Sequence, residues 1–206
     1  MITDRGLPSD FLKRLSELEV SYLAKNDPIR QSGFGGGAQR WRAEREPILD
    51  AIDHSGDFLD VGCANGYLLE CLITWGRKRG FSLTPFGLDW SRKLIALARL
   101  RLSNFHKNFY VSNAWDWKPN RTFLYVYTLY DCVPKEYLEE YIYRLLRRVV
   151  SPTGRLIIGA YGSRSGNFPP FDIASYLTSI GFGVTGLSKG GNPPVAAFAW
   201  IDNREL

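Results

Sequence analysis

The sequence has little of what metal centres and disulfide frameworks require. Its 206 residues include only three cysteines and two histidines. Cys63, Cys71 and Cys132 form no C-x-x-C pair and are odd in number, which predicts reduced thiols and a cytoplasmic protein. Because His54 and His106 are the only further nitrogen ligands, a structural zinc site is not expected. We therefore assign no metal-binding residue.

Long apolar runs are also missing. No segment approaches the roughly 20 apolar residues of a membrane span, and the N-terminus has no apolar core of the kind found in signal peptides. We therefore expect no association with a membrane. The composition, 45% hydrophobic and 23% charged, is that of an ordinary globular protein, and the length suits one domain with a sizeable core.

The strongest structural signal lies in residues 57–72. A short apolar run ends at Gly62, and after Gly66 apolar residues recur at helical spacing, which predicts a strand, a turn and a helix. The small residues Gly62, Ala64 and Gly66 would let a ligand approach the backbone beside the helix N-terminus. Asp60 lies inside the otherwise apolar strand. Since a buried carboxylate is costly without a partner, its presence there indicates a function.

Two classes of nucleotide ligand bind at such a turn. Dinucleotide-binding folds use G-x-G-x-x-G, but here Ala64 holds the middle position and no glycine lies three residues after Gly66. The stretch instead resembles motif I, D-x-G-x-G-x-G, of class I S-adenosylmethionine-dependent methyltransferases, with alanine for the middle glycine. The resemblance implies that Asp60, Gly62, Cys63, Ala64 and Gly66 surround the cofactor. A turn between strand and helix in another α/β protein is the alternative.

A second acid follows at the distance expected for a ribose site. Residues 83–89 predict a strand that ends in Asp89, 23 positions after Gly66. The two oxygens of this carboxylate would accept from the 2′ and 3′ hydroxyls of a ribose. The ribose is common to nicotinamide cofactors and S-adenosylmethionine, so Asp89 indicates a nucleoside without choosing between them. Trp90 comes next and is a further cofactor candidate, and Ser91 is expected to cap the following helix.

The third strand is predicted at residues 108–112 and ends in Asn113 and Ala114. In methyltransferases an acid followed by alanine commonly stands here, and the acid binds the adenine amino group. The resemblance implies the same place for Asn113, whose side-chain oxygen is able to accept that hydrogen bond. Trp115 is a candidate for stacking on adenine, with a place in the core as the commoner alternative for tryptophan.

The loop after the fourth strand is where methyl transfer takes place in this fold class. That strand is predicted at residues 123–129 and is apolar on both faces, as a central parallel strand is. Thr128 near its end is assigned to the cofactor site. Tyr130 and Asp131 are the candidates for a base or an orienting group, although Asp131 equally suits the cap of the next helix. Both histidines precede strands, on the opposite edge of the sheet.

The end of the chain separates the two nucleotide-binding classes most clearly. A turn and fifth strand at residues 151–161 and a short helix at 173–180 lead to two late strands near 181–187 and 195–201, joined by a turn at residues 192–195. An antiparallel hairpin in this place is typical of methyltransferases, whereas a dinucleotide-binding fold would add another βαβ unit. We predict a doubly wound α/β fold: a mostly parallel seven-stranded sheet with an antiparallel C-terminal hairpin and helices on both faces.

Extra elements precede this fold. Residues 8–25 predict an amphipathic helix, which we expect to cover the body of its own domain, with a partner-binding helix as the alternative. Residues 31–37 are too rich in glycine for a regular element and form either a lid over a ligand or a plain linker, and a helix is expected from about Gln39. We accordingly divide the chain into an N-terminal helix and lid segment, 1–38, and an S-adenosylmethionine-binding domain, 39–206.

The resemblance is strongest to a group of bacterial methyltransferases with the pattern Q-S-G-F-G, then W-x-x-x-R, then F-L-D-V-G-C-A-N-G. In this sequence these segments are residues 31–35, 41–45 and 58–66. The match implies that the glycine-rich segment and motif I work together, so that Gln31 and Gly33 touch the cofactor. It does not imply a substrate, because fold and cofactor are shared by many reactions.

Loops at the ligand edge of the predicted sheet are aromatic and carry few cations. The aromatic residues are Trp90, Trp115, Trp117, Tyr130, Tyr161 and Phe168, against Arg92 and Arg164. We therefore expect in-line methyl transfer to a small, apolar or aromatic molecule, and no nucleic-acid partner despite the net charge of +5. An RNA or protein methyltransferase, and a non-catalytic S-adenosylmethionine-binding protein, remain alternatives. The acceptor atom and the oligomeric state stay open.

Overall fold

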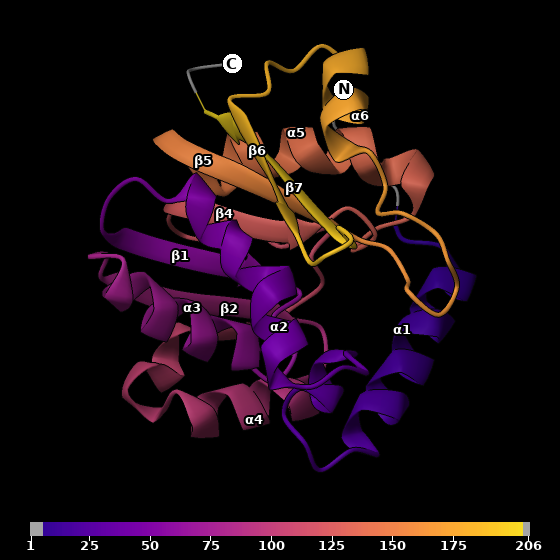
Figure 1. Cartoon of the computed structure of the whole chain (residues 1–206). Helices are drawn as coiled ribbons and strands as arrows, with labels where there is room; N and C mark the ends of the chain where they lie inside the picture. The colour runs from indigo at the N-terminus through magenta and orange to yellow at the C-terminus, as the bar shows by residue number, and fades with distance from the viewer. Residues whose placement is uncertain (1–5, 204–206) are drawn as a thin grey trace.

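The computed structural model describes residues 6–203 and is built on one seven-stranded sheet with the strand order β3-β2-β1-β4-β5-β7-β6 (Figure 1). The strands are β1 (Gly56–Val61), β2 (Leu83–Asp89), β3 (Phe109–Val111), β4 (Phe123–Leu129), β5 (Val150–Tyr161), β6 (Gly186–Gly190) and β7 (Ala196–Asp202). Strand β7 runs antiparallel to both of its neighbours, and the other pairs are parallel. The predicted fold is therefore confirmed, including its C-terminal hairpin.

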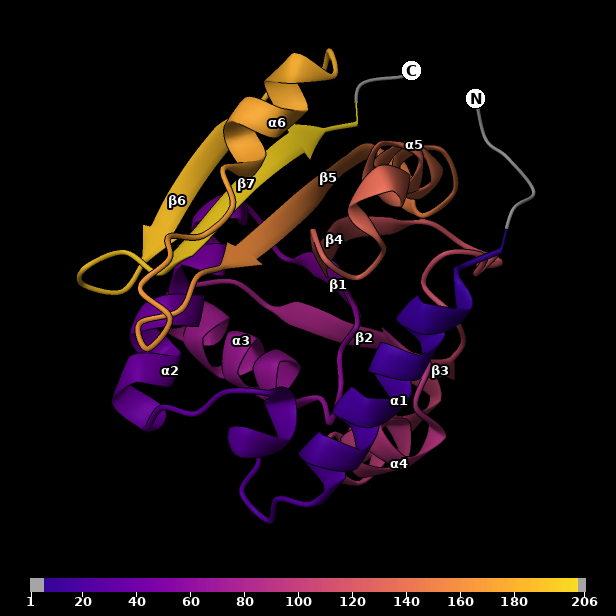
Figure 2. The same ribbon diagram turned by 90° about the vertical axis from the view of Figure 1, so that its right-hand side faces the viewer.

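Helices cover both faces of the sheet (Figure 2). The α-helices are α1 (Ser9–Leu23), α2 (Ala38–Arg45), α3 (Tyr67–Lys78), α4 (Arg92–Arg101), α5 (Leu138–Arg148) and α6 (Ile173–Ser179), and short 3-10 helices are η1 (Arg30–Ser32), η2 (Glu46–Ala51), η3 (Ser103–Asn108) and η4 (Lys135–Tyr137). One buried cluster joins the sheet to α2, α3 and α4, and a second joins it to α5 and α6.

The two faces of β1 explain how the site acid is placed. Successive residues of a strand point to opposite faces. Phe58 packs in the α2–α3 cluster, and Leu59 and Val61 pack in the α5 cluster. Asp60 therefore faces α2 and α3, within the core of the domain. Its side chain is 3% exposed.

The connection from β3 to β4 consists of turns, with no helix between the two strands. Two tryptophans fill the space on the α5 face. Trp115 is 2% exposed and belongs to the buried cluster there, and Trp117 packs against the same cluster. The position of Trp115 is thus that of a core residue, the alternative considered for it.

Two late boundaries were predicted wrongly. The turn expected at residues 151–154 is part of β5, because an irregularity in the pairing with β4 accommodates the extra residues. The sixth strand begins at Gly186, since Gly181 ends α6 at φ +89° and Phe182 turns into the core. The turn predicted at residues 192–195 does join β6 to β7.

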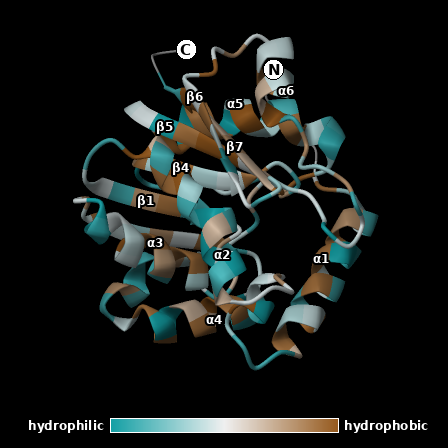
Figure 3. Ribbon diagram, viewed as in Figure 1, coloured by the Kyte–Doolittle hydropathy of each residue, from teal (hydrophilic) through white to brown (hydrophobic). Residues whose placement is uncertain are grey.

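The N-terminal segment packs on the domain. Helix α1 lies beside the carboxyl ends of the central strands and carries both hydrophobic and hydrophilic residues (Figures 1 and 3). Ile29 and Phe34 share one buried cluster with Trp41 and Ile48. The division at residue 38 therefore marks no gap in the packing. Within residues 6–203, no helix has the length and apolar character needed to cross a membrane.

Candidate functional site

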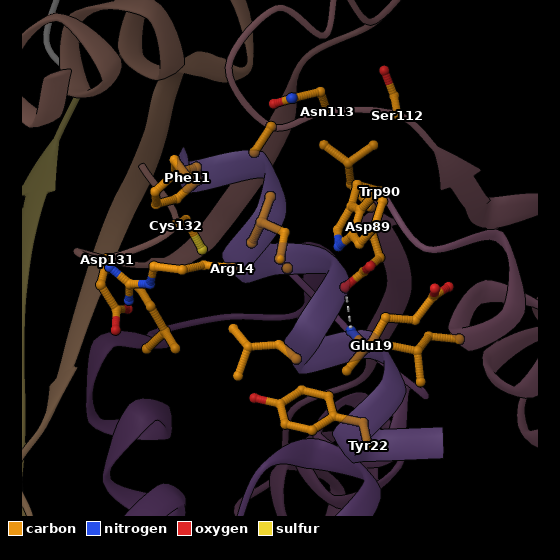
Figure 4. A pocket seen from close by; sticks show the side chains of 18 residues that line it. Phe11, Arg14, Glu19, Tyr22, Asp89, Trp90, Ser112, Asn113, Asp131 and Cys132 are labelled. Atoms are coloured by element: carbon orange, nitrogen blue, oxygen red, sulfur yellow. Dashed lines mark hydrogen bonds between the residues drawn. The ribbon is translucent and has the colours of Figure 1, made fainter. Parts of the chain in front are cut away.

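A cavity lies between α1 and the carboxyl ends of β1, β2 and β4 (Figure 4). It brings together seven of the residues assigned from the sequence: Gly62, Ala64, Asp89, Trp90, Asn113, Ala114 and Asp131. These residues come from four separate loops. The edge of the sheet predicted to bind a ligand is therefore hollowed where motif I and the ribose-site candidate meet.

The turn after β1 has the backbone conformation that close ligand approach requires. Gly62, Ala64 and Gly66 all have positive φ, at +91°, +46° and +74°. Alanine rarely adopts this region, which agrees with the glycine usual at the middle position of motif I. At Gly66 an added Cβ would lie 3.0 Å from the Cβ of Ala98, so this residue also lets α3 and α4 pack closely.

Asp89 is held in place by backbone groups and retains capacity for a ligand. Its Oδ2 accepts from the Ala64 N–H at 2.9 Å, and its Oδ1 accepts from the Ser91 N–H at 2.8 Å. The side chain is 8% exposed, and burial raises its pKa despite these two hydrogen bonds. Each carboxylate oxygen has a second lone pair, so Asp89 is able to accept from two ribose hydroxyls while still supporting the turn.

Asp60 has no such support. Among residues 6–203, no group hydrogen-bonds or pairs with its carboxyl. Burial, with a smaller contribution from Asp89, raises its pKa from 3.8 to about 8. A buried acid without a partner is expensive. Such a group fits a ligand that brings a positive charge, such as the ammonium group of an amino acid.

The raised pKa of Asp60 predicts a pH-dependent stability. The folded chain keeps a proton that the unfolded chain releases above pH 3.8, so this residue makes folding progressively less favourable as the pH rises from about 4 to about 8. Asp60→Asn removes the titration. The melting temperature of the variant minus that of the wild type should therefore increase from pH 5 to pH 8 and level off above, by a few kcal/mol in free energy. A difference that stays constant across this range would contradict the assignment.

The buried Asn65 joins the glycine-rich segment to motif I. Its Nδ2 donates to the Pro28 carbonyl at 3.0 Å and to Gln31 Oε1 at 3.2 Å, and its Oδ1 accepts from the Ser32 hydroxyl at 3.0 Å. Gly33, at φ +76°, lies against the ring of Tyr22. Sequence reasoning placed the two segments together by resemblance and did not identify Asn65, although this residue stands inside the motif.

The other eight assigned residues do not line this cavity: Gln31, Gly33, Asp60, Cys63, Gly66, Trp115, Thr128 and Tyr130. Three of them have contacts elsewhere in the fold. Thr128 is fully buried, and its hydroxyl lies 2.9 Å from that of Tyr141 on α5. Tyr130 stacks on Phe171 with ring centroids 4.8 Å apart. Cys63 is buried at the end of β1, and burial raises the pKa of its thiol well above the ordinary value. These positions suit support of the loops better than contact with a reacting group.

Helix α1 supplies a wall that the sequence did not identify. Phe11, Arg14, Leu15, Leu18, Glu19 and Tyr22 line the cavity from its inner face. Glu19 Oε1 accepts from the Ser91 hydroxyl at 2.5 Å, which ties α1 to the start of α4. Figure 4 shows Arg14 and Asp131 on one side of the cavity and Glu19 and Asp89 on the other. Partial enclosure raises the pKa of Asp131, and Arg14 opposes this effect.

No family model matches this sequence, and no curated protein matches it. Among solved structures, the Burkholderia thailandensis 1,6-didemethyltoxoflavin-N1-methyltransferase, with bound 1,6-didemethyltoxoflavin and S-adenosylhomocysteine, is 12% identical over 100% of this chain and 94% of its own, with a TM-score of 0.68. The magnesium protoporphyrin IX methyltransferase of Synechocystis PCC 6803, with bound S-adenosylmethionine, is 15% identical over 97% and 99%, with a TM-score of 0.63. An S-adenosylmethionine-dependent methyltransferase from Aquifex aeolicus is 16% identical over 92% and 96%, with a TM-score of 0.56.

At these identities the similarity concerns the fold. The similarity in each case extends over nearly the whole of both chains, and this chain has a seven-stranded sheet with an antiparallel β7. The chain therefore has the seven-stranded fold of class I S-adenosylmethionine-dependent methyltransferases.

Proposed function

We propose that the protein is an S-adenosylmethionine-dependent methyltransferase that acts on a small molecule. The observation that supports this most is the pairing of two buried acids around the glycine turn: Asp89, held by backbone N–H groups, and Asp60, without a partner. Their positions suit a ribose and an ammonium group at opposite ends of one ligand. The solved proteins of this fold that bind S-adenosylmethionine or its product add support.

The residues of the chain would divide the work as follows. Asp89 binds the ribose hydroxyls, Asn113 and Ala114 border the base, and the turn from Gly62 to Gly66 lies along the ligand backbone. The cofactor supplies an activated methyl group on its sulfonium. What remains for the protein is to align the acceptor and to exclude water. Asp131, in the cavity wall after β4, is the residue placed to orient an acceptor or take its proton.

A small acceptor is favoured because α1 roofs the cavity. The apolar side chains of Phe11 and Leu15 line the cavity together with Leu129 and Cys132. A polymer would need an open groove with several cations for its phosphates. Arg14 is the arginine that α1 contributes to the cavity lining. The enclosure and its chemistry suit an apolar or aromatic molecule with at most a small anionic group.

Thermal unfolding in the presence of nucleotides tests the proposal. Ligand at about 100 times its dissociation constant adds about 2.7 kcal/mol, which raises the melting temperature of a domain of this size by about 5–10 °C. We expect this rise with S-adenosylmethionine and with S-adenosylhomocysteine. A rise with NADH in their place would contradict the proposal and make the glycine turn a dinucleotide site.

One observation favours a second candidate function, that of a non-catalytic cofactor-binding protein. The Asn113 side-chain oxygen accepts from the Trp115 N–H at 2.9 Å, so the group expected to bind adenine is engaged within its own loop. Transfer of tritiated methyl groups to a small-molecule extract separates the two functions. Label in small molecules supports the enzyme, label in RNA or protein supports a macromolecular substrate, and binding without transfer to any pool supports the non-catalytic protein.

A further inference from the structure

Arg45, at the end of α2, is a buried cation enclosed by aromatic rings. The residue is 7% exposed. Its guanidinium carbon lies 4.2 Å from the ring centroid of Phe34, 4.1 Å from that of Trp41 and 4.4 Å from that of Tyr161. The rings come from the glycine-rich segment, from α2 and from the end of β5. The N-terminal segment and the distant end of β5 therefore converge on one guanidinium.

The hydrogen-bonding capacity of this guanidinium is unused. An arginine carries five N–H donors, yet among residues 6–203 none of those of Arg45 has a hydrogen-bond partner, and its buried Nη1 is left unsatisfied. The acid beside it is Glu44, whose Oε2 is 3.7 Å from that Nη1, too far for a hydrogen bond. Removing a charge from water without such partners is costly.

Glu44 is itself shared among other cations. Its Oε1 accepts from Arg40 Nε and Nη2, each at 3.2 Å, and from Arg164 Nε at 3.4 Å. One carboxylate thus faces three guanidiniums, including that of Arg45. Arg40 and Arg164 also reach solvent, with side chains 48% and 32% exposed, whereas the guanidinium of Arg45 is buried and depends on this shared carboxylate.

Asp60 and Arg45 lie on either side of the same pair of tyrosines. Tyr127 pairs with Asp60 across β4 and β1, and its hydroxyl is 3.2 Å from that of Tyr161, on whose ring Arg45 lies. Asp60 raises the pKa of both tyrosines after the larger effect of burial, and Arg45 lowers it. In the described part of the chain, a buried acid without a partner and a buried cation without a hydrogen bond therefore adjoin the same pair of tyrosines.

We propose that Arg45 binds the carboxylate of the amino-acid end of S-adenosylmethionine, opposite Asp60, which receives the ammonium group. This assignment rests on the proposed function. An amino-acid zwitterion presents both charges at short separation, and the planar guanidinium matches a carboxylate with two parallel hydrogen bonds. The aromatic rings fix the plane of the guanidinium before the ligand arrives, which reduces the entropy lost on binding.

Another buried arginine shows what a structural role looks like in this chain. Arg144 on α5 is 8% exposed and lies 4.1 Å over the ring of Trp115. Unlike Arg45, it donates from Nε and Nη2 to Glu140 at 3.2 and 3.0 Å and from Nη1 to the Trp115 carbonyl at 3.4 Å. The hydrogen bonds of Arg144 are made within the protein, as expected of a residue that supports the fold, whereas the N–H donors of Arg45 are available to a ligand.

Calorimetric titration with two ligands tests the proposal: S-adenosylhomocysteine, and its decarboxylated analogue, which lacks only the carboxylate. Arg45→Met should weaken binding of S-adenosylhomocysteine about 10- to 100-fold and leave binding of the analogue unchanged. Wild type should lose the same factor on decarboxylation of the ligand. The melting temperature of the ligand-free variant should fall, since the change removes the contacts of Arg45 with three aromatic rings and its ion pair with Glu44. Unchanged affinity for the analogue then shows that the folded site is kept.

The matched control is Arg144→Met, which should lower the melting temperature and leave both affinities unchanged. Arg45→Lys provides a second variant that keeps the charge without the planar fork, and we expect an intermediate loss of affinity with S-adenosylhomocysteine only. Equal affinity of the wild type and both Arg45 variants for S-adenosylhomocysteine would overturn the assignment. This holds even if the variants had a higher KM for an acceptor. Failure of the wild type to bind S-adenosylhomocysteine would instead overturn the proposed function.

Discussion

Replacing Asp89 by alanine should weaken binding of S-adenosylhomocysteine by at least about a hundredfold. Two hydrogen bonds from ribose hydroxyls to one carboxylate contribute about 1.5–3 kcal/mol each, and 1.4 kcal/mol corresponds to a factor of ten in affinity. The variant also loses the two backbone hydrogen bonds from Ala64 and Ser91 that shape the site. Calorimetric titration measures the loss directly.

Asp172→Ala is the matched control for this variant. Asp172 likewise accepts a backbone N–H at the start of a helix, that of Ser175 at 3.0 Å, but it lies at α6, away from the cavity lining. Its replacement removes a helix cap and should lower the melting temperature slightly, while the affinity stays unchanged. If Asp89→Ala bound S-adenosylhomocysteine within a factor of ten of the wild type, Asp89 would not be the ribose ligand.

Gly66→Ala should destabilise the protein by about 2–4 kcal/mol. The left-handed conformation costs an alanine about 1–2 kcal/mol, and the new Cβ would lie 3.0 Å from the Cβ and 3.2 Å from the Cα of Ala98. The second contact involves backbone, so α4 has to move, and overpacking of this kind adds about 1–3 kcal/mol. The melting temperature should fall by about 5–15 °C.

Gly80→Ala separates the two contributions. Gly80 follows α3 at φ +89°, and an added Cβ there would meet nothing within 4 Å. This variant should lose about 1–2 kcal/mol from conformation alone. The excess loss in Gly66→Ala is then the cost of separating α3 from α4. Equal losses in the two variants would show that the approach of Ala98 is easily relieved.

Much of the fold and half of the site followed from local pattern. The acids at the ends of β1 and β2 stand out because they interrupt apolar runs, and the glycine turn has a conformation that few residues tolerate. Asp60, Gly62 and Asp89 could therefore be identified from the few residues around each strand end.

The rest depended on packing that a single sequence does not specify. The apolar stripe of α1 predicts that one face is buried, but not that this face covers the cavity. Trp115 is aromatic and lies in the right loop, yet the connection after β3 has no helix, and the tryptophan fills a space on the α5 face. Thr128 was assigned to the cofactor from its place at the end of β4. Its side chain instead points to the face of the sheet that α5 covers, where it contacts Tyr141.

The predicted boundaries of β5 and β6 were wrong for a related reason. Proline and glycine at residues 152 and 154 indicate a turn, but the partner strand tolerates an irregular register there. Conversely, the apolar residues after Gly181 suggested a strand, and Phe182 instead anchors the loop in the core. In both places tertiary contacts decided against the local preference.

Because α1 forms one wall of the cavity, the proposed function would separate the choice of acceptor from the framework of the fold. The sheet and the glycine turn carry the groups assigned to the cofactor, whereas Phe11, Arg14 and Leu15 belong to a helix outside the sheet. Exchanging these side chains alters the shape and charge of the chamber and touches no strand. Under the proposed function, changes in this one short helix would be enough to admit a different acceptor, and the same few positions are the ones to vary in a redesign.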